Sequence, residues 1–326
     1  MDVDRREDVV GGADGVADLP LATDGDGRLV ATRDPDPLRA FDETVTLGDV
    51  PPDVAALVRS AVDDPDEGFF GPGSATWEVS RENTLFLCGP TTILLQIAHP
   101  KVGAALVDHS TLQDDYYTRL HDTFDIIDTV AFGDVTSAVR ASVIVRKIHE
   151  RVTGRVDDDV GPFEAGETYY ANDPELMCWI AATLIDQALT GYETYVGSLS
   201  DETREAYYRE SRIFYRLLGI PADTLPETLE GFYDYYERTL AEEITIGPDS
   251  DAVASGFLGQ FTPEPLVRTL AAGTMPDRGR EAYDLRWGSA RRGLFGGFAR
   301  LVRAVPKDLL PDRYRYREKY REFDRV

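Results

Sequence analysis

Apolar residues recur at helical spacing along most of the chain. The spacing, together with proline, glycine and polar cap signals, predicts helices over residues 53–62, 91–98, 100–107, 114–132, 136–152, 172–195, 201–218, 227–243, 265–272 and 277–305. No segment shows the alternation of apolar and polar residues that is typical of a half-buried strand. The pattern therefore predicts an all-α protein.

Local signals mark two of the helix starts. Pro100 suits the first position of a helix, because its missing N–H needs no partner there. The run Asn172-Asp173-Pro174 combines an Asx cap with proline at the next position. We expect a helix to begin at each of these sites.

The first 36 residues differ from the rest. They are rich in Asp, Gly, Pro and Arg and have no periodicity, so we expect residues 1–36 to form a mobile acidic tail and residues 37–326 to form a single helical domain. The N-terminal residues lack a hydrophobic signal region, and the longest apolar stretch, residues 84–98, is too short to span a bilayer. We expect a cytoplasmic protein without stable membrane insertion.

Composition adds a strong charge to this picture. The net charge is −25, and only four of the 34 basic residues are lysines. Such an acidic surface repels nucleic acid and anionic lipid, which bind to positively charged surfaces. It also favours a halophilic source for the protein. The two cysteines, Cys88 and Cys178, each lie in an apolar run and are interpreted as buried residues rather than a disulfide or a metal pair.

All four histidines lie between Gln96 and His149. Imidazole is a common iron and zinc ligand and a proton carrier near neutral pH, so the cluster indicates a candidate site. His99 precedes the helix at Pro100 and is either a helix cap or a pocket residue. His109 ends that helix, where a cation favours the helix dipole. His121 is interpreted as solvated, although a metal site with Asp125 is a second interpretation.

The helices over residues 114–132 and 136–152 carry the other candidates. Arg119 and Thr123 are four residues apart and share a face with apolar residues. A buried arginine needs an anionic partner, which is either a core carboxylate or an anionic group of a bound cofactor or substrate. His149 lies at the edge of an apolar stripe and fits either a structural histidine or an axial ligand of a haem.

Several common sites are missing from the sequence. It has no Glu-x-x-His pair of a ferritin-like di-iron site and no His-Glu-x-x-His, Walker loop, Gly-x-Ser-x-Gly or Cys-x-x-Cys motif. A redox cofactor bound by one or two histidines is consistent with these absences.

The order of several short motifs resembles a known family. The motifs are Leu94-Leu-Gln-Ile-Ala-His-Pro100, Asp108-His-Ser110, Arg119-Leu-x-x-Thr123, Phe132-Gly133, Val145-Arg-Lys-Ile-His149-x-x-Val152 and Tyr170-Ala-Asn-Asp-Pro-Glu175-Leu, followed by Trp179. Together they resemble the latex-clearing (rubber oxygenase) and mycophenolate-pathway (MpaB-type) oxygenases. The resemblance is strongest over residues 69–218.

The resemblance implies a globin-like helical core around a b-type haem, and the use of dioxygen to cleave carbon–carbon double bonds of isoprenoid chains. It implies His149 as the iron ligand, with Arg119 and Thr123 near the haem, and His99 is a further candidate for the distal side. Where rubber oxygenases can place a distal lysine, this chain has Asp122.

The sequence therefore predicts a haem b-dependent oxygenase that acts with dioxygen on a small apolar, unsaturated substrate. The alternative is a helical haem-binding or lipid-binding protein without catalysis. The oligomeric state is left open.

Overall fold

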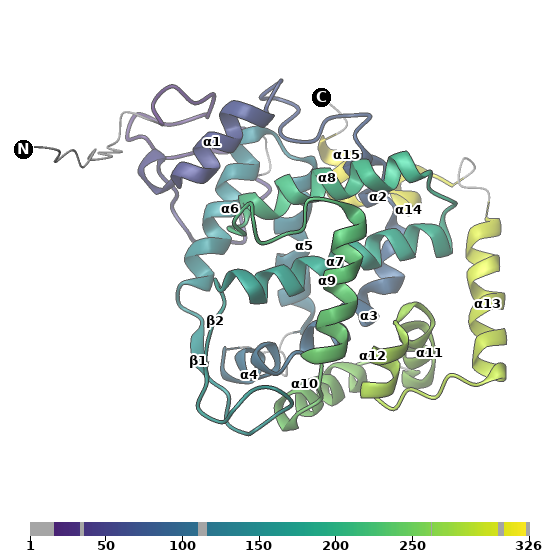
Figure 1. Cartoon of the computed structure of the whole chain (residues 1–326). Coiled ribbons are helices and arrows are strands. Elements are labelled where there is room, and N and C mark those ends of the chain that lie inside the picture. Colours follow the sequence, from purple (N-terminus) through teal and green to yellow (C-terminus); the bar gives the residue numbers. More distant parts are fainter. Residues whose placement is uncertain (1–15, 33–35, 110–115, 262, 306–309, 324–326) are drawn as a thin grey trace, which may run out of the picture.

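Helices form most of the described chain (Figure 1). The computed structural model describes residues 16–32, 36–109, 116–261, 263–305 and 310–323, with no side chains described for residues 116–120. In chain order, the first helices are the 3-10 helix η2 (Leu47–Asp49), α1 (Pro52–Ala61), α2 (Ala75–Ser80), the 3-10 helix η3 (Asn83–Cys88), α3 (Gly89–Ile97), α4 (Pro100–His109), α5 (Tyr116–Phe132) and α6 (Val135–His149). They are followed by α7 (Pro174–Tyr195), α8 (Asp201–Leu217), α9 (Leu229–Glu242), α10 (Pro248–Gly259), α11 (Glu264–Thr274), α12 (Asp277–Ala282), α13 (Ser289–Ala304), α14 (Asp312–Arg315) and α15 (Glu318–Phe323).

Both predicted helix starts are confirmed. Pro100 is the first residue of α4. Asp173 caps α7, and its carboxylate accepts a hydrogen bond from the backbone N–H of Glu175 at 2.9 Å. Cap and proline signals are local, and for that reason the sequence locates these helix ends well.

The expectation of no strand is wrong at one place. Strand β1 (Thr153–Arg155) pairs antiparallel with β2 (Thr168–Tyr170). Each strand has three residues, which is too short to show the alternation by which strands are recognised.

The single helix expected over residues 277–305 is also wrong, because α12 and α13 are separate. Asp284 adopts a positive φ of 45° just after α12, a conformation that a continuing helix excludes. The helices α2, η3, α10, α14 and α15 were not predicted either. All but the 12-residue α10 have six residues or fewer and so carry few periodic positions.

Part of the expected acidic tail packs on the helical body. Leu19 and Leu29 are buried, and Thr32 donates a hydrogen bond to the Asp134 carboxylate at 2.6 Å, at the start of α6. Residues 1–15 lie outside the described residues, and a mobile tail there stays a prediction. The globin-like arrangement also stays a prediction.

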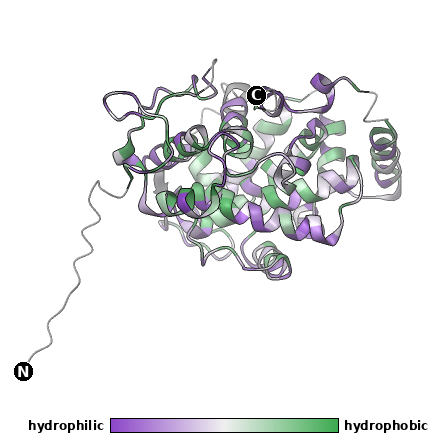
Figure 2. Ribbon diagram, turned by 90° about the horizontal axis from the view of Figure 1, so that it is seen from above, coloured by the Kyte–Doolittle hydropathy of each residue, from purple (hydrophilic) through white to green (hydrophobic). Residues whose placement is uncertain are grey.

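Helix α7 crosses the middle of the molecule (Figure 1). The buried indole of Trp179 ties it to α3 by donating to the carbonyl of Leu95 at 3.2 Å. A Cβ at Gly191 would meet the Cys88 sulfur at 2.8 Å, so the glycine allows η3 to pack directly on α7. The main apolar core extends from Leu19 to Phe323, and hydrophobic and hydrophilic residues alternate along the helices around it (Figure 2).

Within the described part of the chain, no helix is both long and apolar enough to cross a bilayer. The longest described helix, α7, contains charged residues such as Asp186 and Glu193.

Candidate active site

A cavity with a volume of about 200 Å³, open to solvent on one side, lies among α2, η3, α3, α5, α7 and α8. Its walls are largely apolar, with side chains such as Leu85, Ile93, Ile127, Ile180 and Leu184. The sheltered apolar space, with a few polar groups at defined positions, is typical of sites for small apolar ligands.

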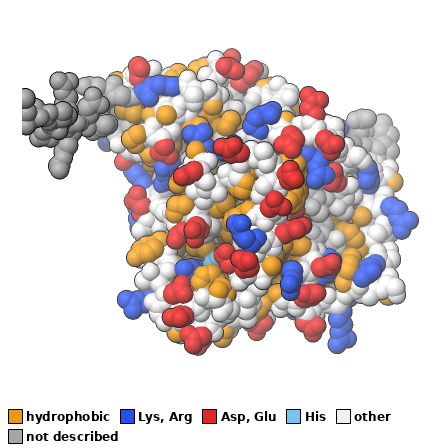
Figure 3. Space-filling model, viewed as in Figure 1, with side chains coloured by type: hydrophobic (Ala, Val, Ile, Leu, Met, Phe, Trp, Pro, Cys, Tyr) orange, Lys and Arg blue, Asp and Glu red, His pale blue; other side chains and the backbone are white. Residues whose placement is uncertain are grey.

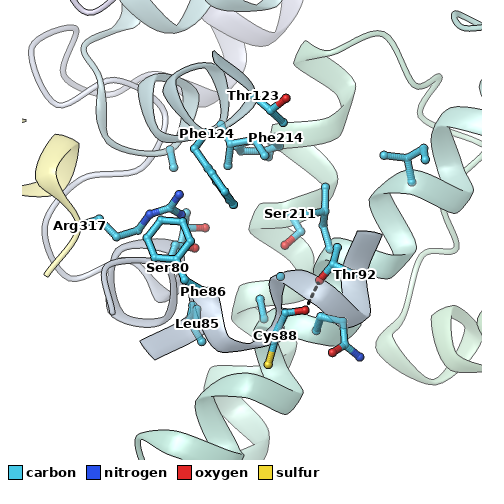
Figure 4. A pocket seen from close by; sticks show the side chains of 18 of the residues that line it. Ser80, Leu85, Phe86, Cys88, Thr92, Thr123, Phe124, Ser211, Phe214 and Arg317 are labelled. Carbon is cyan, nitrogen blue, oxygen red and sulfur yellow. Dashed lines mark hydrogen bonds between the residues drawn. The ribbon is translucent and has the colours of Figure 1, made fainter. Parts of the chain in front are cut away.

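The helices around the cavity are held in place by buried hydrogen bonds. The Trp77 indole donates to the carbonyl of Ala131 at 3.1 Å and so joins α2 to α5. Gln96 donates to Thr183 at 3.0 Å and joins α3 to α7. In Figure 4 the dashed line is the bond from the Thr92 hydroxyl to the Cys88 carbonyl, at 3.1 Å.

Of the predicted site residues, Thr123 lines this cavity. It comes from α5, near Phe124 and Phe214 in Figure 4. Thr123 is also exposed to solvent, so it lies where the cavity opens. Arg119 is part of α5 one turn earlier, but its side chain lies outside the described residues.

His149 is the last residue of α6 and is half-buried. Only Gly133 and Asp134 connect α5 to α6, and the two helices pack side by side, so they run antiparallel. The end of α6 therefore lies beside the beginning of α5. Arg119 and His149 consequently belong to the same end of this helix pair, although His149 is not among the residues that line the cavity.

His99 is buried away from the cavity, and both of its ring nitrogens contact other parts of the protein. Its Nδ1 accepts a hydrogen bond from the backbone N–H of Lys101 at 3.2 Å, and its Nε2 lies 3.5 Å from a carboxylate oxygen of Glu243. His99 holds the pKa of Glu243 below its usual range. These contacts favour the helix-cap interpretation of His99 over the pocket interpretation.

The other two histidines lie at the surface. His121 is exposed, which is the solvated position that its helix face predicts. His109, at the end of α4, donates a hydrogen bond to the Thr153 carbonyl at 2.9 Å. Within the described residues, no three His, Cys, Asp or Glu side chains come together as a metal site.

A polar region of the cavity was missed by sequence reasoning. The C-terminal strap, residues 310–323, places Arg317 in the cavity wall beside Phe86. The Arg317 guanidinium lies 4.7 Å and 5.0 Å from the ring centres of Phe86 and Phe124. It also lies 2.8 Å from a carboxylate oxygen of Asp128. The alternating Arg and Tyr residues of the strap were the only sequence signal.

The pair of Arg317 and Asp128 is almost fully buried, with 7% and 5% of the residues exposed. The two atoms are close, but the N–H does not point at the oxygen well enough to form a hydrogen bond. Burial raises the pKa of Asp128 to about 7, because the loss of hydration outweighs the attraction of Arg317. Asp128 is therefore a carboxyl group that can exchange a proton near neutral pH.

A second buried pair lies at the same wall. Glu82 lines the cavity and is 1% exposed, and one of its oxygens accepts two hydrogen bonds at 3.1 Å from Arg315. Cys88 also lines the cavity, and burial raises the pKa of its thiol to about 12. The thiol thus stays protonated near neutral pH and is no nucleophile there.

The cavity residues suit a flat apolar cofactor such as haem in one respect. Apolar side chains in the wall would shield a porphyrin from water, and the Thr123 hydroxyl lies at the cavity opening. His149, the last residue of α6, carries an imidazole, which is a common ligand of haem iron. It lies at the same end of the α5–α6 pair as Arg119.

Comparison with known proteins agrees with the motifs. Residues 77–304 match the family described as the catalytic domain of ER-bound oxygenase mpaB/B' and rubber oxygenase. An uncharacterized protein of Mycobacterium tuberculosis and one of Mycobacterium bovis are each 23% identical to the chain over 235 residues, which cover 68% of this chain and 88% of the relative. No solved structure matches the chain.

The matched segment contains α3, α5, α7 and α8, which form most of the cavity wall, and it ends with α13. On this match, the chain belongs to the oxygenase family that comprises the catalytic domains of ER-bound oxygenase mpaB/B' and rubber oxygenase.

Proposed function

We propose that the protein is a haem b-dependent oxygenase that acts with dioxygen on a small apolar, unsaturated substrate. The observation that carries the proposal is the apolar cavity with Thr123 in its wall, within a chain of an oxygenase family. When bound, haem would supply the activation of dioxygen.

His149 is the residue proposed to bind the iron. His149 lies in the last turn of α6. The Arg146 side chain anchors this end of α6 to α8, because it donates hydrogen bonds to the carbonyls of Arg216 and Leu217 at 3.0 Å and 3.1 Å. A ligand at a well-anchored helix end keeps its orientation, which a metal site requires.

Arg119 and Thr123 are proposed to act on the same group. A guanidinium at Arg119 would pair with a propionate or hold the distal side, and the Thr123 hydroxyl would donate a hydrogen bond at the cavity opening. Asp122 stands where rubber oxygenases can place a lysine, so the proposal extends to the substrate class and not to rubber itself.

The apolar wall has its own part in the reaction. Leu85, Ile127 and Leu184 exclude water from the bound substrate and orient a hydrocarbon chain without hydrogen bonds. Specificity for an apolar substrate would therefore come from the shape of the wall.

The proposal is tested by the absorbance spectrum of haem-reconstituted protein. His149→Ala should shift or abolish the Soret band, whereas His121→Ala, at an exposed histidine of the neighbouring helix, should leave it unchanged. Circular dichroism of both variants checks that the helices persist. If His149→Ala retains the wild-type spectrum, His149 does not bind the iron.

Oxygen consumption separates an oxygenase from the alternative, a binding protein without catalysis. The holoprotein should consume dioxygen when an isoprenoid or carotenoid is added. Thr123→Val should lower the rate about fivefold, since a lost hydrogen bond is worth about 1 kcal/mol. Thr269→Val is the matched control, because the Thr269 hydroxyl donates to the Pro265 carbonyl of its own helix, α11, and does not line the cavity. A haem protein that consumes no oxygen is a carrier.

A further inference from the structure

Helix α13 and the residues before it carry a charge opposite to that of the chain. Between Leu285 and Val305 there are five arginines and no acidic residue, in a chain with a net charge of −25. The arginines are Arg286, Arg291, Arg292, Arg300 and Arg303. Basic side chains project from the edge of the molecule where Figure 1 places α13 (Figure 3).

These arginines make no ion pair with any carboxylate of the described residues. Arg292 donates to the Trp287 carbonyl at 3.0 Å and Arg300 to the Gly296 carbonyl at 2.9 Å, both on their own segment. Arg303 donates to the Glu193 carbonyl and the Ser198 hydroxyl at 3.2 Å. In a protein with so many carboxylates, this charge is left available for an anionic partner.

The exposed side of α13 is also apolar. Leu294 is 69% and Leu301 is 67% exposed, the highest values among the large hydrophobic residues that the structure describes as exposed. They are seven residues apart, so they lie on one face two turns apart. Gly293 and Gly297 on the same side are exposed as well, which leaves the leucines uncovered.

A neighbouring side of the helix is anchored. Phe295, Phe298 and Val302 pack around the buried Tyr195 and Cys88, so α13 is a fixed part of the molecule. Its exposed leucines and arginines are therefore held at constant positions. The arrangement has the features of an interfacial amphipathic helix, with apolar side chains on one flank and arginines on another.

We infer that α13 docks the protein on the surface of a membrane that contains anionic lipid. Leu294 and Leu301 enter the boundary of the acyl chains, and Arg292 and Arg300 contact lipid phosphates. The overall charge predicts repulsion from anionic lipid, so the local basic face also fixes the orientation, with α13 toward the membrane and the acidic surface away from it.

A bilayer surface is favoured over a second copy of the chain because it offers both anionic groups for the arginines and an apolar phase for the leucines. The acidic surface of another copy would pair with the arginines, but it would leave Leu294 and Leu301 without an apolar partner. Docking would also bring the cavity close to apolar compounds dissolved in the bilayer, since Cys88 contacts the α13 cluster and lines the cavity. This last link rests on the proposed function, whereas the docking itself does not.

The test is co-sedimentation of the full chain with vesicles in about 0.1 M salt. Vesicles of phosphatidylcholine mixed with phosphatidylglycerol should sediment the protein, and vesicles of phosphatidylcholine alone should not. Arg292→Gln/Arg300→Gln should weaken binding about 25-fold, about fivefold for each charge. Leu294→Ser/Leu301→Ser should also weaken it.

The matched control removes two exposed arginines elsewhere, Arg278→Gln/Arg313→Gln, and should bind as the wild type does. The inference is overturned if the protein ignores anionic vesicles, or if the α13 variants and the control bind equally. It is likewise overturned if the α13 variants change the sedimentation velocity of the protein without lipid, because α13 would then bind a second copy. Oxygen consumption is not measured, so failure of the proposed function leaves this result unaffected.

Discussion

Two neighbouring parts of the C-terminal region use arginine in opposite ways. In the C-terminal strap, the half-buried Arg315 lies against the carboxylate of Glu82, and the buried Arg317 lies against the carboxylate of Asp128. In α13, Arg292 and Arg300 are exposed and donate only to carbonyls of their own segment. Burying a charge without a partner costs several kcal/mol, and exposing one costs almost nothing. An arginine that stabilises the fold can therefore be identified by a buried carboxylate beside it. The arginines of α13 have no such carboxylate beside them among the described residues.

The largest effect is expected at Arg315. Arg315→Met leaves the Glu82 carboxylate, which is 1% exposed, without the two hydrogen bonds at 3.1 Å that it accepts. The free energy of unfolding should fall by about 3 kcal/mol, the cost of removing one partner of a buried pair. Urea unfolding at neutral pH measures it.

Arg313→Met is the control for this prediction. Arg313 belongs to the same strap but is exposed, with its guanidinium 4.7 Å from the ring of its own neighbour Tyr314. Equal losses in the two variants would show that the strap depends on its arginines in general and not on the buried pair.

The effect at Arg317 should depend on pH. The pKa of Asp128 is raised from 3.8 to about 7 in the folded protein, so between these values the native state binds more protons than the unfolded state. Stability contributed by this group is present below about pH 4 and is lost as the pH rises to about 7. Without Arg317 the pKa of Asp128 rises further, so the folded protein continues to lose stability as the pH increases above 7.

Arg317→Met should therefore cost little at pH 5 and more at pH 9. At pH 5 only the contacts with the Phe86 and Phe124 rings are lost, about 1 kcal/mol. Above pH 7 the cost grows by up to about 1.4 kcal/mol for each pH unit. Urea unfolding at both pH values compares the variant with the wild type. Asp128→Asn, which removes the titrating group, should lack this slope, and a cost independent of pH would contradict the account.

The strap also shows where prediction from the sequence ends. Helices α5, α6 and α7 follow from local spacing and from caps such as Asp173, because these interactions lie within a few residues. Asp128 lies two turns after His121 on the same face of α5, yet it is buried whereas His121 is exposed. The strap covers that face at Asp128 and leaves His121 exposed, and no spacing within α5 carries this information.

The same limit applies to the candidate site. Thr123 was predicted from its motif and does line the cavity. His99 belongs to an equally good motif, but it lies against Glu243, which comes from the end of α9, far along the chain. Motifs identify residues that matter, whereas the contacts that distinguish a pocket residue from a cap form only in the folded chain.

The smallest effect is expected in α13. Arg292→Gln/Arg300→Gln removes two charges whose hydrogen bonds to carbonyls at 3.0 Å and 2.9 Å are made at the surface, where water replaces them. The free energy of unfolding should change by less than about 0.5 kcal/mol, the usual range for exposed positions. Thermal and urea unfolding in the absence of lipid measure it. A loss of about 2 kcal/mol or more would mean that these arginines stabilise the fold as Arg315 does, and the contrast between the two regions would then disappear, together with the reason to seek an external partner for α13.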